Sequence, residues 1–488
     1  MKQKSIRKNF LMNIILTMSS FIFPLITFPY ISRILQPDGT GKVAFVTSIV
    51  SYFALFSQLG IPMYGIRVCA QVRDNREELT RIAQELLIIN LMTSFICYVA
   101  LAISIILIPR FYEERTLFII VSSGIFFSTI GMEWLYKALE QYMYITIRSI
   151  IFKLIALIFL FLMVHEEKDY IAYGFITVFA ASASNILNLI NVHNYIGFKL
   201  VGNYDFKRHI RSIIIFFAMS CATTIYTNLD TVMLGFMKSD TEVGYYNAAV
   251  KIKMILVSIV TSLGSVILPR ASYYIENGMK DKFMQMNRKA LSFVIMLAMP
   301  LTVYFIIYAK NGILFLSGQA YRGSILPMQV IMPTLLFIGI TNILGIQILV
   351  PTGKEKAVLY SELAGAVVDI VINVILIPSL ASVGAAIGTL IAEAVVFIIQ
   401  YFYLRNDMKE IVREIHFDRI IIGTFLAVIF SMWIQFLNLN NFIVLIISTT
   451  IFFGVYILYM LFKKDEILIE LIEQILYKIK QHNLDEKK

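Results

Sequence analysis

Long apolar runs alternate with short polar loops from one end of the chain to the other. Each run is about as long as the 20 residues that an α-helix needs to cross a bilayer. The runs are continuous rather than alternating, which is typical of helices and not of the strands of an outer-membrane barrel. The pattern predicts spans near 9–32, 43–66, 86–109, 116–132, 145–164, 170–194, 212–237, 245–269, 290–309, 325–350, 357–378 and 382–404, and a last pair within 420–462.

The composition agrees with this pattern. Of the 488 residues, 58% are hydrophobic and only 15% are charged, which leaves too little polar surface for a water-soluble chain. We therefore expect an all-α integral membrane protein with fourteen transmembrane helices. The loops are too short for a catalytic domain and no HExxH, Walker A or GxSxG motif occurs, so we do not expect an enzyme. Cys69, Cys97 and Cys221 lie in separate apolar runs, where we expect them to fill space rather than bind a metal.

The basic residues predict the orientation. The net charge is +10, and with the N-terminus inside, 31 of the 42 Lys and Arg residues fall in cytoplasmic segments while eight fall outside. Because basic loops stay in the cytoplasm, we expect both termini there. Basic cytoplasmic loops that face anionic lipid also explain the positive charge without a nucleic-acid partner.

A repeat at an offset of 203 residues relates the first two spans to the seventh and eighth. The turns that end at Gly41 and Gly244 each lead into another span, and the same offset carries Arg67 onto Arg270. Spans one to six and seven to twelve therefore predict two lobes of the same orientation around a central cleft, as in a carrier that works by rocking. The predicted parts are a cytoplasmic N-terminus at 1–9, an N-lobe at 10–211, a C-lobe at 212–404, a loop with the last helix pair at 405–462, and a cytoplasmic amphipathic tail at 463–488.

Ionisable residues within the spans need a partner, a neutral state or a water-filled cavity, because a charge at the bilayer centre costs about 2.5 to 3.5 kcal/mol. Asp230 and Lys251 lie at matching depth on consecutive spans, where they form either a structural ion pair or a pair that lines the cleft. Lys153 lies roughly 12 Å inside the fifth span. Its ammonium either snorkels to the inner surface or faces the cleft, where it would suit a phosphate.

Two carboxylates are predicted near the middle of the bilayer. Asp369 and Glu393 lie roughly 18 and 16 Å from the ends of the eleventh and twelfth spans, and neither helix has a basic residue at that level. We expect these groups to be protonated or linked to an ion. Coupling to a proton or sodium gradient is one interpretation, and a neutral carboxyl group hydrogen-bonded between helices is the other. No further cofactor or metal site is expected.

Six segments carry a likeness to a known family: FPYISRIL at 28–35, GIPMYGIR at 60–67, EWLYKALE at 133–140, NLDTVMLG at 228–235, EVGYYNAA at 242–249, and the stretch from Asn373 through Gly384 to Glu393. In order and spacing they resemble the Wzx-type polysaccharide flippases of the MATE-like (MOP) superfamily, over nearly the whole chain. The chain departs from them at Gln36, where relatives usually carry a glycine that suits a tight turn.

The resemblance implies a flippase that moves an undecaprenyl-diphosphate-linked oligosaccharide repeat unit from the inner to the outer leaflet of the bacterial cytoplasmic membrane, for capsule, O-antigen or exopolysaccharide synthesis. It implies transport driven by an ion gradient or a potential, without ATP. Basic residues of the cleft would hold the diphosphate, and the positions that match are Arg33, Lys153 and Lys251. The implied partners are the lipid-linked oligosaccharide, membrane lipid, and the polysaccharide polymerase with its chain-length machinery.

Other functions stay open at this point. A MATE-type antiporter of small molecules or cations and a lipid II flippase would share the architecture. A membrane polymerase or ligase that acts on lipid-linked sugars would share the hydropathy. Such an enzyme normally needs a long outer loop with catalytic polar residues, and the longest loop here, at about 310–324, is too short for that role.

Overall fold

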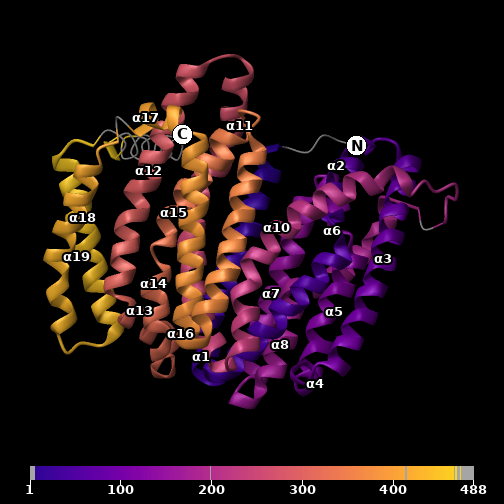
Figure 1. Ribbon diagram of the computed structural model, residues 1–488. Helices are drawn as coiled ribbons and strands as arrows, with labels where there is room; N and C mark the ends of the chain where they lie inside the picture. Colours follow the sequence, from indigo (N-terminus) through magenta and orange to yellow (C-terminus); the bar gives the residue numbers. More distant parts are fainter. Residues whose placement is uncertain (1–5, 198, 413–414, 466–467, 470–472, 474–488) are drawn as a thin grey trace, which may run out of the picture. The chain divides into compact units, whose positions relative to one another are not determined.

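The computed structural model describes residues 6–197, 199–412, 415–465, 468–469 and 473, and this part of the chain is helical apart from short connections (Figure 1). No β-strand occurs among these residues. The predicted all-α class is therefore confirmed. The predicted amphipathic tail lies almost entirely outside the described residues.

The helices fall into two compact units, Met1–Asn247 and Ala248–Lys488. The first unit, indigo to magenta in Figure 1, contains α1 (Ile6–Gln58), α2 (Ile61–Gln71), α3 (Arg76–Leu107), α4 (Pro109–Glu113), α5 (Arg115–Gly131), α6 (Glu133–Ala138), α7 (Tyr142–Met163), α8 (Tyr170–Val178), α9 (Asn185–Asn191), α10 (Lys207–Met237) and the start of α11 (Asp240–Glu276). The second contains the rest of α11, α12 (Lys280–Ile307), α13 (Ala309–Ser317), α14 (Ile325–Ile331), α15 (Thr334–Thr341), α16 (Glu355–Tyr403), α17 (Arg405–Val412), α18 (Phe417–Met432) and α19 (Asn441–Phe462).

The helix α10 packs with the first unit at two places. At Gly60, between α1 and α2, an added Cβ would overlap the backbone of Phe217, so the two segments cross in direct backbone contact. Near the start of α10, the buried ring of His209 joins Tyr64 of α2 and Glu85 of α3, at 2.8 and 2.7 Å. The packed unit therefore extends past residue 211. The lobe boundary predicted at this residue divides the two copies of the sequence repeat and not two packed units. It stays a prediction.

Many of the helices are long enough to cross a membrane. Within the described ranges nine helical stretches are long and apolar enough to do so, or up to ten if the bent pair Gln319–Ile331 and Thr334–Leu349 counts as one span. Two of the nine, Leu11–Gln71 with 61 residues and Glu355–Tyr403 with 49, are much longer than one crossing requires. Each of the two is broken along its length. The chain is a multi-pass membrane protein, while the count of fourteen spans stays a prediction.

The first break lies in α1 at Gln36, where the backbone leaves the helical region with φ 56° and ψ 178°. This region is used almost only by glycine and costs another residue about 1 to 3 kcal/mol. The Gln36 side chain offsets part of that cost, because its amide donates a hydrogen bond to the carbonyl of Arg33 at 2.6 Å. The tight turn therefore forms here although the chain lacks the glycine that relatives usually carry.

The second break lies in α16 at Ala381, with φ 48° and ψ −125°. It follows Pro378, which has no N–H to donate to the helix. The position matches the turn that was predicted between the eleventh and twelfth spans. As a result α16 is a hairpin of two helical arms, and residues far apart along it face each other.

Two glycines bring the first break of α1 against the start of α11. An added Cβ on Gly41 would overlap the carbonyl of Asp240, and one on Gly244 would overlap the carbonyl of Pro37. Both glycines are buried, and both contacts lie within the first unit. Beside them, Arg110 of α4 forms an ion pair with Asp240 at 2.5 Å. The two segments therefore touch backbone to backbone, with no room for a side chain between them.

Candidate functional site

Lys153 lies near the middle of α7, and its ammonium points at α1. It donates hydrogen bonds to the hydroxyl oxygens of Ser19 and Ser20, at 2.9 and 3.0 Å. These serines lie near the middle of the predicted first span, at 9–32. A lysine that snorkels would instead carry its ammonium to the end of its helix. The ammonium therefore lies between two helices of the first unit, beside the middle of the predicted first span.

The partners of Lys153 are neutral. Among the residues that the structure describes, no carboxylate lies within ion-pair distance of its ammonium. An ammonium has three N–H donors, and the two serines use two of them. Since a charge at this depth is costly unless it is paired or hydrated, the arrangement suits an anion that arrives from outside the protein.

Arg148, one and a half turns before Lys153 on α7, has the opposite environment. Its side chain is only 3% exposed. The guanidinium donates to Ser184 at 2.7 Å, to Asn185 at 2.9 Å and to Glu133 at 3.0 Å. Its charge is therefore already compensated within the unit, by a carboxylate and two polar side chains, and Arg148 joins α7 to α6 and to the start of α9.

Glu133 accepts from two cations, because Lys137 also binds it at 2.9 Å. Burial by itself would raise the pKa of the Glu133 carboxyl, but Lys137 and Arg148 act in the other direction and bring it below its ordinary value. Glu133 is thus held as a carboxylate and is occupied by its two partners. Both of its carboxylate oxygens already have a cationic partner, and Lys153 binds the two serines instead.

Arg33 is placed well away from Lys153. It lies 13 residues after Ser20 on α1, which corresponds to roughly 20 Å of helix. The exposed guanidinium donates to the carbonyl of Pro29 at 2.6 Å. The structure therefore does not bring Arg33 and Lys153 into one cluster. Lys251, the third predicted ligand of the diphosphate, is half-buried on α11 in the second unit.

Asp230 is buried on α10, with 5% of its surface exposed. The hydroxyl of Tyr246, on α11, donates a hydrogen bond to its carboxyl group. This contact within the first unit was not predicted. The predicted pairing of Asp230 with Lys251 joins residues of different units and stays a prediction.

Asp369 and Glu393 lie on the two arms of the α16 hairpin, and both are buried. Each is 12 residues from the break at Ala381, so they lie at the same level of the hairpin. Contacts between the arms agree with this register, because an added Cβ on Gly388 would lie 3.0 Å from Asp369. The hairpin therefore brings the two predicted carboxylates to one level.

The same face of the hairpin carries further polar side chains. The buried Gln400 donates to Ser361 at 3.1 Å across the arms. An added Cβ on Gly388 would also overlap the amide of Asn373. The arms thus pack with small and polar residues between them, and the two carboxylates belong to this polar stripe.

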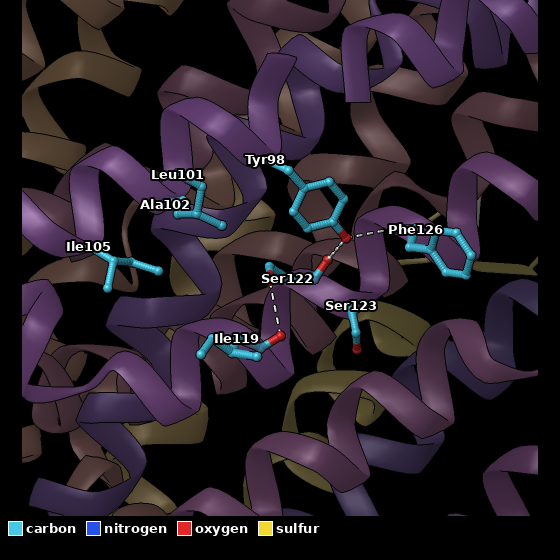
Figure 2. A pocket seen from close by; sticks show the side chains of 8 residues that line it. All are labelled: Tyr98, Leu101, Ala102, Ile105, Ile119, Ser122, Ser123 and Phe126. Atoms are coloured by element: carbon cyan, nitrogen blue, oxygen red, sulfur yellow. Dashed lines mark hydrogen bonds between the residues drawn. The ribbon is translucent and has the colours of Figure 1, made fainter. Parts of the chain in front are cut away.

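A cavity of about 440 Å³ lies between α3 and α5 (Figure 2). It is lined by Tyr98, Leu101, Ala102, Ile105, Ile119, Ser122, Ser123 and Phe126. The Tyr98 hydroxyl accepts from the N–H of Phe126 at 3.1 Å and donates to the carbonyl of Ser122 at 2.6 Å, so it is inserted into the backbone ladder of α5. None of the lining residues is charged, which makes the cavity unsuited to a diphosphate.

Three side chains of this arrangement are not predicted from the sequence. Ser19 and Ser20 are adjacent hydroxyls in an otherwise apolar run, and that feature could have marked them. Arg148 falls within the edge of the predicted span at 145–164, and nothing at that position indicates that its side chain is buried. Only the packing of α7 on its neighbours shows that its side chain is buried.

Comparison with known proteins gives consistent matches. Residues 6–275 match the family described as "Polysaccharide biosynthesis protein", and residues 216–375 match the MatE family. A proposed O-antigen transporter of Escherichia coli (strain K12) is 23% identical over 83% of this chain and 97% of its own length. A proposed O-antigen transporter of Shigella dysenteriae is 26% identical over 80% of this chain and 98% of its own length.

Solved structures share the fold. The structure of the lipid II flippase MurJ in an inward closed conformation has a TM-score of 0.73 and 16% identity, and covers 93% of this chain and 99% of MurJ. An inward-facing multidrug resistance transporter of the MATE family, from the MOP superfamily, has a TM-score of 0.64 and 12% identity, and covers 83% of this chain and 99% of that transporter. The predicted MATE-like architecture is confirmed by these two likenesses.

Proposed function

Because the chain belongs to the polysaccharide biosynthesis protein family, we propose that it is a flippase that moves a lipid-linked oligosaccharide across the bacterial cytoplasmic membrane. The cargo is an undecaprenyl-diphosphate-linked repeat unit, carried from the inner to the outer leaflet for capsule, O-antigen or exopolysaccharide synthesis. The two relatives named as proposed O-antigen transporters, matched over most of their length, support this cargo.

The observation that carries the proposal is the environment of Lys153. Its ammonium is held by two serine hydroxyls near the middle of the predicted first span, and it forms no ion pair within the described residues. A diphosphate that crosses the membrane needs such a cation, because the bilayer itself offers no compensating charge. The apolar tail of the cargo needs no site of this kind, since it stays in the hydrocarbon.

Transport by alternating access is supported by the contact of Gly41 with the start of α11. The two sides of this contact come from the two copies of the sequence repeat, and the repeat offset carries one side onto the other. Such a contact is expected where two parallel repeats meet on their common axis. Under the predicted orientation the contact lies on the outer side. It must then separate for the sugar to leave, and it must close again before the next cycle.

The driving force is proposed to be a proton or sodium gradient, or the membrane potential. Asp369 and Glu393, level with each other on α16, and Asp230 on α10 are the candidate coupling groups. The sequence carries no Walker A motif that would point to ATP. We further propose that both termini are cytoplasmic, that the chain is a carrier and not an enzyme, and that it works beside a polysaccharide polymerase and its chain-length partner.

A MATE-type antiporter is the second candidate. The match of residues 216–375 to the MatE family favours it. An antiporter would confer resistance to small cations and would leave lipid-linked sugars unchanged. A flippase for lipid II, the other related activity, would instead support growth when the native lipid II flippase is depleted.

The test is complementation of a strain that lacks its O-antigen or capsule flippase, with lipid-linked intermediates measured by mass spectrometry. The wild-type chain should restore surface polysaccharide. Lys153→Ala should leave undecaprenyl-diphosphate-linked repeat units accumulated inside. Lys168→Ala, which removes an exposed ammonium of the same unit, is the matched control and should behave as wild type. Full polysaccharide with Lys153→Ala would remove the assigned cargo site.

A further inference from the structure

The two serines beside Lys153 have hydroxyl protons that point away from it. Ser19 donates to the carbonyl of Leu16 at 2.7 Å, and Ser20 donates to the same carbonyl at 3.2 Å. Their oxygens at the same time accept from the ammonium of Lys153. Each hydroxyl therefore uses its donor on the backbone of its own helix and offers only a lone pair to the lysine.

Rotation of these two hydroxyl protons would change what the cluster offers. A hydroxyl can accept from the lysine and donate elsewhere at the same time. Turned outward, the two O–H groups and the third N–H of Lys153 would present three donors from one small region. The carbonyl of Leu16 loses little, because a helix carbonyl already accepts from the backbone N–H four residues later.

The position of the cluster allows a ligand to reach it. Ser20 is exposed, and Ser19 and Lys153 are half-buried. Arg148, only five residues from Lys153, has no comparable freedom, since its guanidinium is buried on Glu133, Ser184 and Asn185. The two cations of α7 thus divide into one that holds the unit together and one whose third N–H donor bonds to no residue that the structure describes.

From this geometry we infer that Ser19 and Ser20 are ligands of the diphosphate in their own right and bind one phosphate group together with Lys153. The inference rests on the proposed function and deepens it, because it assigns the polar contacts of the headgroup on α1. Hydrogen bonds to a charged phosphate are stronger than those to a neutral carbonyl, so the anion itself favours the outward rotation of both hydroxyls.

A simpler role for the serines is to solvate the ammonium and nothing else. The two roles differ in what happens when Lys153 is absent. Serines that touch the phosphate still contribute to binding in a Lys153→Ala background. Serines that act only through the lysine contribute nothing there. A double-mutant cycle therefore separates the two roles.

The experiment uses the full chain in lipid nanodiscs. Binding of undecaprenyl diphosphate and of inorganic pyrophosphate is measured for wild type, Lys153→Ala, Ser19→Ala with Ser20→Ala, and the triple variant. Removing both serines should weaken binding of undecaprenyl diphosphate about tenfold in the presence of Lys153, and about threefold in its absence. Pyrophosphate should follow the same order if the headgroup alone is recognised, and should not bind if the lipid tail is required.

Two controls keep the result specific. Thr17→Ala removes a hydroxyl of the same helix that is bonded to the carbonyl of Asn13 and has no contact with Lys153, so it should bind as wild type does. Replacing Ser19 and Ser20 by threonine keeps both hydroxyls and should restore binding, which guards against a mere folding defect.

Equal affinities of Lys153→Ala and the triple variant would overturn the inference while leaving the proposed function intact. Absence of undecaprenyl diphosphate binding by the wild-type chain would instead contradict the proposed function itself.

Discussion

Gly41 and Gly244 lie on opposite sides of one backbone contact and make equivalent interactions in it. Gly41 packs on the carbonyl of Asp240, and Gly244 packs on the carbonyl of Pro37. The offset of 203 residues that carries Gly41 onto Gly244 also carries Pro37 onto Asp240. The repeat offset thus exchanges the two sides of the contact, as a two-fold axis exchanges two identical surfaces. It indicates that the duplication is structural and not an accident of sequence.

The first prediction concerns the closure of this contact. In Gly41→Ala the new methyl group would overlap Asp240 and lie 2.9 Å from the nitrogen of Gly244, so the two segments cannot approach as closely. We expect transport to fall at least tenfold, because this contact can no longer close. Spin labels on cysteines at positions 38 and 239, in a variant whose three native cysteines are replaced by alanine, would report a longer distance than in the unmodified contact.

Gly454→Ala is the matched control for that experiment. Nothing lies within 4 Å of a Cβ at Gly454, so the same chemical change there should alter neither the distance nor the transport rate. An unchanged distance in Gly41→Ala would mean that the segments tolerate a side chain, and the proposed closure at this position would be wrong.

The second prediction concerns the ion pair of Arg110 and Asp240. Both side chains are partly exposed, so the pair is worth about 1 kcal/mol, or about fivefold in the closing equilibrium. Arg110→Asp and Asp240→Arg should each shift the label distances toward the open state, since each places like charges side by side. The double reversal should restore the wild-type distribution. Single variants without effect would show that the pair does not contribute to closing.

The third prediction concerns the backbone at Gln36. Glycine adopts φ 56° and ψ 178° without strain, but it lacks the amide that binds the carbonyl of Arg33. Since the strain and the hydrogen bond are both of order 1 kcal/mol, Gln36→Gly should leave the unfolding temperature unchanged or slightly higher. Gln36→Val should lower it by several degrees, because a β-branched residue fits this region poorly. Thermal unfolding in detergent measures the unfolding temperatures of the two variants. Equal unfolding temperatures for Gln36→Val and Gln36→Gly would contradict the prediction.

The fourth prediction concerns the pH dependence of stability at Glu133. Lys137 and Arg148 hold the pKa of Glu133 below its ordinary value of 4.5. A carboxyl group with a lowered pKa in the folded state adds stability above its ordinary pKa and loses it as the pH falls through the lowered value. The wild-type chain should therefore unfold at a higher temperature than Glu133→Gln at about pH 7. This difference in unfolding temperature should become smaller below about pH 4.5. A difference that widens on acidification would contradict this sign.

Much of the architecture could be predicted from the sequence, because the pattern that governs it is local. Apolar runs of span length, the turn near 378–382 and the repeat around Gly41 and Gly244 are all visible in the residues themselves. The break at Gln36 does not follow from the residue itself, because a backbone with positive φ is usually adopted by glycine. It depends on a side-chain hydrogen bond that forms only in the folded turn.

The candidate site was predicted only in part. The sequence indicates that Lys153 is a cation within a span, but its serine partners come from a helix more than 130 positions earlier. The family resemblance groups Arg33 with Lys153, although Arg33 lies several turns along α1 from the serines that bind Lys153. Asp230 has Tyr246 as a partner, which no spacing rule suggests. Contacts between helices depend on their rotation and tilt, and neither is fixed by hydropathy.

The proposed function requires that this chain carry an anionic lipid-linked sugar across the membrane by means of Lys153. The most direct measurement is the rate at which an undecaprenyl-diphosphate-linked oligosaccharide, loaded in one leaflet of vesicles that contain the purified chain, becomes accessible to a lectin on the other side. We expect translocation by the wild-type chain and by Lys168→Ala, and a rate at least tenfold lower for Lys153→Ala. Equal rates for Lys153→Ala and wild type, or no translocation by the wild-type chain under an imposed ion gradient, would contradict the proposed function.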